Sequence, residues 1–414
     1  MGREIRHEPE TMTEPNRNPR CTNRFERRRL LQVLGAAGTL GVAGCLGDDD
    51  ATETGDDGSP EDGTETDDGS SDEDGIPWST SLDGSNFWSP TVVEDTVFVG
   101  GQGLVAAIET GSGSVRWTEE FEMLMRNATV FDGTVYVQGN EGVFALDASD
   151  GSEQWSVELD FIGGIPGHTP TVYDGMVLAY SATSHIRAFD AEDGSDVWER
   201  NVGGANNGVS IVDDVYYTTS GEEAFALDPT DGSVIWERSV PAFLNRSVVG
   251  EGLLYGAGDG ELFAYDLETG EEEWVYEQGD GMNFPTVHDG TLYVHESATG
   301  LIALEADSGE EKWIVEDDLH ILGATPSVVG DTVFSTALDE MRVIDADTGE
   351  ILDTHEPADA NTIGSPIIVD GVLYATSDDT VLAFEVDVEG SSEDARIVTG
   401  VEGHHHTLVA ERGG

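Results

Sequence analysis

The sequence predicts an all-β fold, an eight-bladed β-propeller made of four-stranded antiparallel blades. Seven tryptophans recur at steps of 39, 38, 43, 38, 38 and 39 residues. Between them, short β-rich runs alternate with turns that contain glycine. A repeat of about 40 residues with four short strands is typical of propeller blades. The repeats run from about residue 76 to residue 386 of the 414-residue chain, so we expect one closed ring.

The unit that ends at Trp155 illustrates the repeat. Its β-rich runs lie at 129–131, 134–137 and 143–147 and are separated by short turns. Interruptions of this kind between β-rich runs predict hairpins. Gly151 stands four residues before Trp155, at a bend that needs a positive φ. The tryptophan therefore falls on the fourth, outer strand of the blade.

Eight inner hairpins determine the number of blades. They are centred on Asp95, Asp132, Asp174, Asp213, Glu251, Asp289, Asp331 and Asp370. The eighth unit stops near Glu385 without the glycine and tryptophan that should follow, whereas Trp78 has no hairpin before it. We therefore expect the N-terminal strand around Trp78 to complete the last blade and to remove two exposed sheet edges. A C-terminal strand at 395–398 is the alternative closure.

The recurring tryptophans are expected to be structural. A large indole at each blade boundary would fill the gap between neighbouring blades, while its N–H finds a polar acceptor. Asp353 stands where the next tryptophan would fall, so one boundary lacks its indole. The residues assigned to blade docking are Trp78, Trp117, Trp155, Trp198, Trp236, Trp274 and Trp313.

The N-terminal region has the features of an export signal followed by a lipid attachment site. Arg27 and Arg28 precede an uncharged stretch at 30–46, which is long enough for a signal core and too short to span a bilayer. This pattern is similar to a twin-arginine signal. Residues 42–45 resemble a lipobox, in which Cys45 becomes the lipidated first residue of the mature protein. The prediction is a protein held by lipid on the outer face of the cell membrane.

Composition divides the chain into four segments. Residues 1–45 form the predicted signal peptide. Residues 46–75 form a linker that carries fourteen acidic residues and no basic residue between positions 48 and 74. Such a segment cannot bury a core, and its self-repulsion predicts a disordered, extended tether. Residues 76–390 form the propeller and residues 391–414 a polar C-terminal tail.

The charge balance excludes some partners. The chain has 84 acidic and 18 basic residues, which gives a net charge of −66. Because nucleic-acid binding depends on basic residues, nucleic acid is not expected as a partner. Such acidity is typical of proteins adapted to molar salt, which screens the self-repulsion. Cys21 lies upstream of the predicted cleavage point and Cys45 carries the lipid, so we expect a mature domain without disulfides. We also expect the protein to be a monomer.

The repeat motif resembles a known family. The stretch at 226–236, Ala-Leu-Asp-Pro-Thr-Asp-Gly-Ser-Val-Ile-Trp, is similar to the PQQ-like repeat of the quinoprotein dehydrogenase superfamily. The resemblance covers residues 76 to about 386. It implies a propeller but not one activity, because the superfamily contains both PQQ-dependent dehydrogenases and non-catalytic binding propellers. The chain most resembles the second group, the BamB-like lipoproteins, which implies a binding or assembly scaffold.

A PQQ-dependent alcohol or sugar dehydrogenase is the alternative function. In such alcohol dehydrogenases the quinone lies between a tryptophan and a disulfide of adjacent cysteines, above a calcium ion. The mature chain has no cysteine pair. Its nearest cluster of oxygen ligands for calcium is Asn206 and Asn207, with Asp280 and Asn283 from other loops. We therefore expect no cofactor, no metal site and no catalytic residue, with PQQ and calcium retained as the alternative.

The loops that follow the tryptophan strands are the predicted binding surface. In propellers such loops surround the mouth of the channel, and here they contain methionine, phenylalanine and two of the few domain arginines. The candidate residues for binding a protein or peptide are Met123, Met125, Arg126, Phe161, Phe243, Arg246, Met282 and Phe284. Two alternatives remain open. Phe161 and Phe243 could stack on the sugars of a surface glycan, or these side chains could simply fill the funnel.

Overall fold

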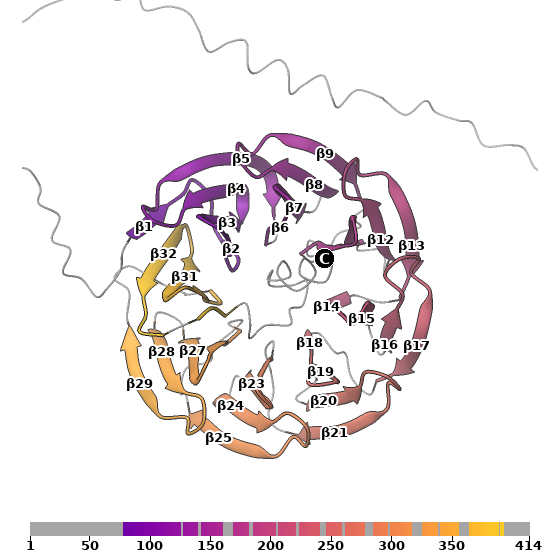
Figure 1. Ribbon diagram of the computed structural model, residues 1–414, viewed down its shortest axis with the longest axis vertical. Helices are drawn as coiled ribbons and strands as arrows, with labels where there is room; N and C mark the ends of the chain where they lie inside the picture. Colours follow the sequence, from indigo (N-terminus) through magenta and orange to yellow (C-terminus); the bar gives the residue numbers. More distant parts are fainter. Residues whose placement is uncertain are drawn as a thin grey trace, which may run out of the picture. The chain divides into compact units, whose positions relative to one another are not determined.

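The computed structural model describes most of the propeller. The described residues are 78–125, 127–139, 142–159, 169–181, 185–203, 206–220, 223–240, 246–258, 261–277, 285–296, 299–316, 325–337, 340–355, 364–388 and 390–392. They form eight four-stranded antiparallel sheets arranged around a central axis (Figure 1). Within these ranges no helix is long and apolar enough to cross a membrane. The predicted all-β, eight-bladed architecture is confirmed.

In each blade the first strand is innermost and the fourth is outermost (Figure 1). The strands of blades 1 to 4, in chain order, are β2 (Thr91–Val93), β3 (Thr96–Gly100), β4 (Gln102–Glu109) and β5 (Val115–Leu124); β6 (Thr129–Phe131), β7 (Thr134–Gly139), β8 (Gly142–Asp147) and β9 (Glu153–Glu158); β10 (Thr171–Tyr173), β11 (Met176–Ser181), β12 (His185–Asp190) and β13 (Asp196–Asn201); β14 (Asn206–Val212), β15 (Val215–Ser220), β16 (Glu223–Leu227) and β17 (Val234–Ser239).

Blades 5 to 7 follow the same order. Their strands are β18 (Arg246–Gly250), β19 (Leu253–Gly258), β20 (Glu261–Asp266) and β21 (Glu272–Glu277); β22 (Thr286–His288), β23 (Thr291–Glu296), β24 (Gly300–Glu305) and β25 (Glu311–Glu316); β26 (Ser327–Val329), β27 (Thr332–Ala337), β28 (Glu340–Asp345) and β29 (Ile351–His355). Blade 8 contains β30 (Ile367–Val369), β31 (Val372–Ser377) and β32 (Thr380–Glu385), with β1 (Trp78–Ser81) as its fourth strand.

The N-terminal strand closes the ring. β1 pairs antiparallel with β32, in a register that runs from Trp78 opposite Ala383 to Ser81 opposite Thr380. The last blade is thus completed by the two ends of the propeller sequence, as the unpaired Trp78 predicts. The alternative strand at 395–398 lies outside the described residues, and the edge that it would have needed is occupied by β1.

The hairpin between the first and second strands has the same construction in most blades. In blade 2 the two central residues are Asp132 and Gly133, with φ of 47° and 75°. Two consecutive positive φ values define a type I′ turn, whose twist matches that of the flanking strands. Asp and Gly are among the residues that adopt this conformation at least cost, which explains the recurrent Asp-Gly pairs.

Each tryptophan fastens its blade to the next one. The Trp117 indole on β5 donates its N–H to the carbonyl of Ala148 in blade 2, at 2.9 Å. Its ring covers Gly151, whose φ is +75°, so closely that a Cβ on this glycine would lie 2.6 Å from the ring. The seven periodic tryptophans make equivalent hydrogen bonds of 2.6 to 3.1 Å. We call this combination of indole, glycine and carbonyl the seam lock.

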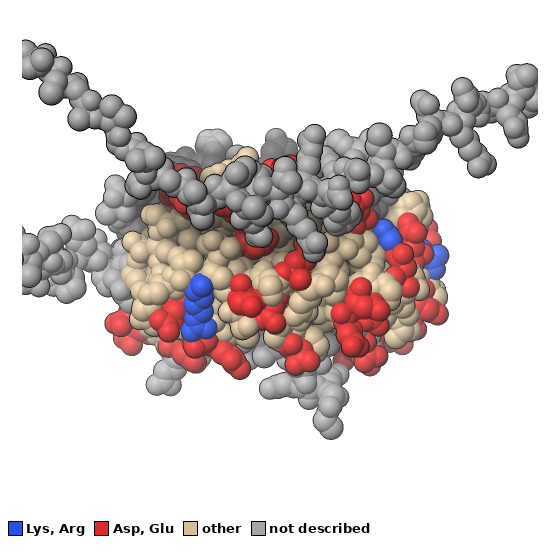
Figure 2. Space-filling view, turned by 90° about the horizontal axis from the view of Figure 1, so that it is seen from above, with Lys and Arg blue, Asp and Glu red and all other residues tan. Residues whose placement is uncertain are grey.

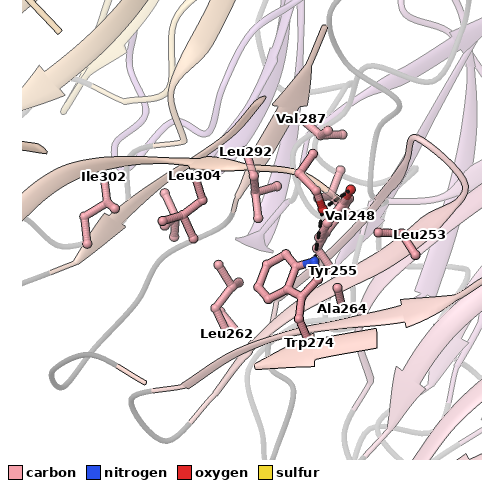
Figure 3. Packing of buried hydrophobic residues seen from close by; sticks show 13 residues of the cluster. Val248, Leu253, Tyr255, Leu262, Ala264, Trp274, Val287, Leu292, Ile302 and Leu304 are labelled. Atoms are coloured by element: carbon pink, nitrogen blue, oxygen red, sulfur yellow. Dashed lines mark hydrogen bonds between the residues drawn. The ribbon is translucent and has the colours of Figure 1, made fainter. Parts of the chain in front are cut away.

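The core between blades 5 and 6 shows how the seam lock is buried. The hydroxyl of Tyr255 and the indole N–H of Trp274 both donate to the carbonyl of Ala306, at 3.1 Å each. Leucine, isoleucine and valine side chains from both blades surround this acceptor (Figure 3). The ring centroids of Tyr255 and Trp274 are 5.9 Å apart in a tilted arrangement. Burying these aromatic rings contributes hydrophobic stabilisation, while the shared acceptor satisfies their polar groups.

The seam between blades 7 and 8 has no lock. Asp353 on β29 takes the tryptophan position, and its side chain remains mostly exposed beside His355. Blade 8 offers no turn between its third and fourth strands, because β32 and β1 come from opposite ends of the chain. The acceptor and the glycine are therefore missing together with the indole. Here Val386 and Val388, which follow β32, pack against the core of the seam.

The seam lock predicts a position-specific effect of alanine. Gly151→Ala should lower the free energy of unfolding by about 2–4 kcal/mol, because it combines a left-handed backbone with a clash against the buried Trp117 ring. Gly133→Ala has the same φ of +75° but meets no atom within 4 Å, so we expect a loss of about 1 kcal/mol. Denaturant unfolding in concentrated KCl measures both. Equal losses would contradict the lock.

The missing lock predicts an asymmetry between two seams. Trp313→Ala should cost about 3–5 kcal/mol, since it empties a buried site and removes a hydrogen bond to Ala346. Asp353→Trp should not raise the melting temperature, because no turn in blade 8 can receive the new indole. A rise of several degrees in thermal unfolding would show that the seam can accept a lock after all.

Candidate functional site at the loop rim

The strand directions place the irregular connections at one end of the ring. Every outer strand ends, and the next inner strand begins, at this end, which we call the loop rim. The opposite end carries the turns between the first and second strands and between the third and fourth strands, and we call it the turn rim. The predicted binding loops therefore connect strands at the loop rim.

Most of the predicted binding residues cannot be placed in detail. Arg126, Phe161, Phe243, Met282 and Phe284 lie outside the described residues, as do Arg27, Arg28 and Cys45. Met123 and Arg246 belong to β5 and β18, but only their backbone is described.

Met125 is the one candidate whose side chain is described. It is 1% exposed and packs among the apolar residues between blades 1 and 2. Its amide donates to the carbonyl of Gly101 at 3.0 Å. Met125 therefore fills the seam between blades 1 and 2 and offers no accessible surface to a partner. This location agrees better with the alternative in which the candidate side chains have a packing role.

The connection between β1 and β2 is the loop-rim connection that the structure describes in full. The amide of Phe87 donates to Asp378 at 3.4 Å and that of Trp88 to Gly100 at 3.0 Å, so the segment is held by blades 8 and 1. The Phe87 ring lies against Gly84 and Gly101, where a Cβ would approach it to 2.7 and 2.5 Å. These contacts hold the backbone of Trp88 at the rim, and its side chain is partly exposed.

Trp88 lies beside exposed polar groups. Asn86, with φ of 51°, donates from its side-chain amide to that of Gln102 at 3.3 Å, and both side chains are exposed. The carboxylates of Asp378 and Asp379 are exposed on the neighbouring turn of blade 8. A flat apolar ring next to amide donors and acceptors can stack on a ligand and hydrogen-bond to it. Trp88 falls outside the 40-residue period, so the pattern that identified the other tryptophans passed over it.

A belt of buried polar side chains lies below the loop rim. Residues at the fifth position of the second strands reach across seams to the next blade. Gln138 hydrogen-bonds to the backbone of Tyr180, and Thr376 donates to the carbonyl of Phe87 at 3.3 Å. His295 does the same through a 2.8 Å hydrogen bond to Ser335. Aligning the eight second strands would have shown this position, because five of its eight residues are Gln, His or Thr, namely Gln138, Thr219, His295, Thr336 and Thr376.

The His295 and Ser335 pair has the distance of a base and a nucleophile but not the accessibility. Their side chains are on residues 3% and 2% exposed, so no substrate atom can approach the hydroxyl. Glu296 follows His295 along β23, and side chains alternate across a strand. Burial and the charges of Glu311 and Glu296 raise the pKa of the Tyr276 hydroxyl in blade 5. Because the hydroxyl of Ser335 is inaccessible, the pair of His295 and Ser335 serves as a cross-link between blades 6 and 7.

No group of three metal-binding side chains is found among the described residues. Of the calcium candidates, Asn206 and Asn207 lie in β14 with only their backbone described, and Asp280 and Asn283 lie outside the described residues. Six of the seam tryptophans are 7–9% exposed, and Trp198 is partly buried. The ring of each one lies against a glycine. Because a glycine of the next blade already covers each ring, these tryptophans do not fit the role of a residue that stacks on a quinone.

The turn rim is strongly acidic. Asp and Glu gather along one edge of the propeller (Figure 2). Many of them shape the turns: the carboxylate of Asp266 accepts hydrogen bonds from the amide and hydroxyl of Thr269, which lower its pKa. Asp345 is bonded in the same way to Thr348. The Arg116 guanidinium lowers the pKa of Asp95 to about 2. This rim repels anionic partners.

The turn carboxylates predict how stability depends on pH. Because the folded pKa of Asp266 lies below its ordinary 3.8, its contribution is present above pH 3.8 and is lost as the pH falls through the folded pKa. Asp266→Asn should therefore be less stable at pH 7 and should lose less stability on acidification. Asp132→Asn removes the same charge from a turn that Asn also tolerates, and it serves as the control. Unfolding should be followed in concentrated KCl, and identical pH profiles for both variants would contradict the assignment.

Comparison with known proteins is consistent with this architecture. A family model of PQQ repeats, described as outer membrane protein assembly factor BamB, matches residues 70–161, 103–248 and 243–408. No curated protein matches the chain. Among solved structures, BamB from Moraxella catarrhalis is 20% identical with a TM-score of 0.62, covering 75% of this chain and 97% of its own.

Two further structures show how widely the fold is used. A computationally designed protein, Ika8, is 14% identical with a TM-score of 0.64, covering 74% of this chain and 98% of its own. The quinohemoprotein alcohol dehydrogenase ADHIIG from Pseudomonas putida HK5 is 16% identical with a TM-score of 0.62, covering 76% of each chain. At these identities the likeness shows the fold alone.

Proposed function

Because the chain belongs to the PQQ-repeat family of the outer membrane assembly factor BamB, we propose that it is a scaffold whose loop rim binds extended polypeptide segments. We further propose that it is exported through the twin-arginine signal at Arg27 and Arg28 and held by a lipid on Cys45 at the outer face of the cell membrane. The propeller acts as a monomer.

The observation that carries the proposal is the partly exposed side chain of Trp88 on a backbone segment that is held at the loop rim. Its segment is tied to blades 8 and 1 by backbone hydrogen bonds and by the packed Phe87 ring. Because the backbone of this segment is already held in place, less entropy is lost when it binds a ligand. The amides of Asn86 and Gln102 beside it can pair with the backbone of an extended peptide. The seam tryptophans, in contrast, are committed to the framework.

The attachment of the tether favours the same face. β1 begins at the turn rim, where the Trp78 indole bonds to the turn carbonyl of Thr110 at 2.6 Å. The acidic linker at 46–75 therefore joins the propeller at the turn rim. A protein tethered there presents its loop rim away from the point of attachment.

Peptide arrays in concentrated KCl test the binding face. Trp88→Ala should weaken peptide binding at least about tenfold, because it removes the aromatic anchor and leaves the seam locks intact. Arg126→Glu with Arg246→Glu should also weaken it if the predicted loops take part. Ile235→Ala, on the exposed outer strand β17, is the matched control and should bind as the wild type does.

Several outcomes would replace the proposal. Peptide binding that is unchanged by Trp88→Ala would remove the loop rim from the function. Stoichiometric PQQ absorbance with calcium, together with dye-linked alcohol oxidation, would establish a dehydrogenase instead. Binding to a glycan array but not to peptides would favour the glycan alternative. Cys45→Ser should release the protein from membranes, and its retention there would refute the lipid anchor.

A further inference from the structure

The seam between blades 7 and 8 is joined on its inner side in the same way as the seam before it. The hydroxyl of Ser327 on β26 donates to the carbonyl of Pro366, just before β30. At the seam between blades 6 and 7, Thr286 on β22 makes the same bond to Pro326, at 2.6 Å. On the outer side, Asp353 takes the place of the indole. This seam therefore keeps the inner attachment but lacks the outer one.

The chain that leaves the third strand of blade 8 begins as in the other blades. The amide of Val386 donates to the carbonyl of Gly371 in the first hairpin of the blade, at 2.9 Å. In blade 6, Ala306 donates to Gly290 at the same distance. Ala306 then leads through a turn into the outer strand β25, whereas β1 supplies the outer strand of blade 8. The chain after Val386 is therefore released for another role.

This chain crosses instead to the inner strand of its own blade. We call the described residues 386–388 and 390–392 the strap. The amide of Ser392 donates to the carbonyl of Ile368 on β30 at 2.8 Å, and its hydroxyl accepts from the N–H of Ile368 at 3.0 Å. The hydroxyl of Ser391 donates to the same carbonyl at 2.9 Å. Ser392 is buried. The strap is thus anchored to blade 8 by both backbone groups of one residue.

The strap also contacts blade 7. Val386 and Val388 are partly buried and pack against the core of the seam, to which blade 7 contributes Val329 and Phe334. The backbone of the strap passes close to the same strand, since a Cβ on Gly390 would lie 3.5 Å from the side chain of Val329. The strap is therefore hydrogen-bonded to blade 8 and packed on apolar residues of blade 7. It bridges the seam that has no lock.

A strap and a lock differ in what must be exposed to release them. Releasing the lock of Trp313 exposes a whole indole that is 8% exposed in the closed ring, and it breaks the hydrogen bond to Ala346. Releasing the strap from blade 7 exposes two valine side chains that are already partly accessible. Because the cost of exposing apolar surface grows with its area, the strap should release first.

We propose that the strap is a latch, and that its release lets blades 7 and 8 separate at their outer side while the seven locked seams stay closed. The bond of Ser327 to Pro366 near the axis then acts as the hinge. A ligand or protease that displaces the strap opens the ring at this one place without unfolding the other blades. This inference does not depend on the proposed function.

Thiol reactivity compares the latched seam with a locked one. Leu373 and Leu292 are the second residues of β31 and β23, and both are fully buried, in the seam between blades 7 and 8 and in that between blades 5 and 6 (Figure 3). Each is changed to Cys in a chain with Cys21→Ser and Cys45→Ser, which has no other cysteine. In concentrated KCl, Leu373→Cys should react with a maleimide at least about tenfold faster than Leu292→Cys, each rate being normalised to the unfolded chain.

Shortening the chain tests the strap itself. A chain that ends after Glu385 lacks the strap, and the rate at Leu373→Cys should rise by about a further tenfold while that at Leu292→Cys stays within about twofold. A chain that ends after Ser392 keeps the strap and is the matched control. Where the shorter chain does not fold, Val386→Asp with Val388→Asp in the full chain weakens the same contacts and should give the same selective increase.

Three results would overturn the latch. Equal normalised rates at the two positions would mean that this seam opens no more readily than a locked one. Loss of the strap that accelerates both thiols alike would show a general stabilising role. A fast rate at Leu373→Cys that does not change when the strap is removed would show that the seam opens without regard to the strap.

Discussion

The structure depends on the seam lock, an indole from one blade stacked on a positive-φ glycine of the next and hydrogen-bonded to a carbonyl of the same turn. Each of blades 1 to 6 contributes one half of two different locks. Its glycine receives the tryptophan of the preceding blade, and its own tryptophan, four residues later, reaches the following blade. Because both residues are needed to join neighbouring blades, the glycine and the tryptophan recur together in the sequence. Neither can change alone without leaving an unfilled gap or an uncovered turn.

The unlocked seam follows from the same geometry. A ring closed by β1 has no turn between the third and fourth strands of blade 8, so a tryptophan at position 353 would have nothing to cover. Both halves are accordingly replaced: Asp353 stands at the indole position, and Asp74 stands four residues before Trp78, where the other units have glycine. The valines that follow β32 fill the space instead. The missing tryptophan is therefore a consequence of N-terminal closure and not an independent irregularity.

The sequence allowed the fold to be predicted more completely than the binding site, because the fold depends on repetition. Period, turn chemistry and the unpaired Trp78 were sufficient for eight blades and for the closing strand. Periodicity could not show which neighbouring blade each indole contacts. It also could not show that Met125 points into a seam, since a methionine after an outer strand suits a rim and a core equally well. Trp88 and His295 were passed over because their roles depend on contacts between distant segments and not on spacing.

The location of the locks accounts for the functional range of the architecture. They join outer strands to outer turns, whereas the first strands and the loop rim contribute little to them. The locks are thus concentrated at large radius, whereas the first strands contribute buried side chains such as Val130 and Val287 to the cores between blades. The same fold is found in an assembly factor, a designed protein and an alcohol dehydrogenase. In this chain the inner positions also hold polar contacts, such as those of Gln138 with Tyr180 and of Ser392 with Ile368. Under the proposed function, specificity would come from the loop rim, because the outer framework is shared with proteins as different as an assembly factor and an alcohol dehydrogenase.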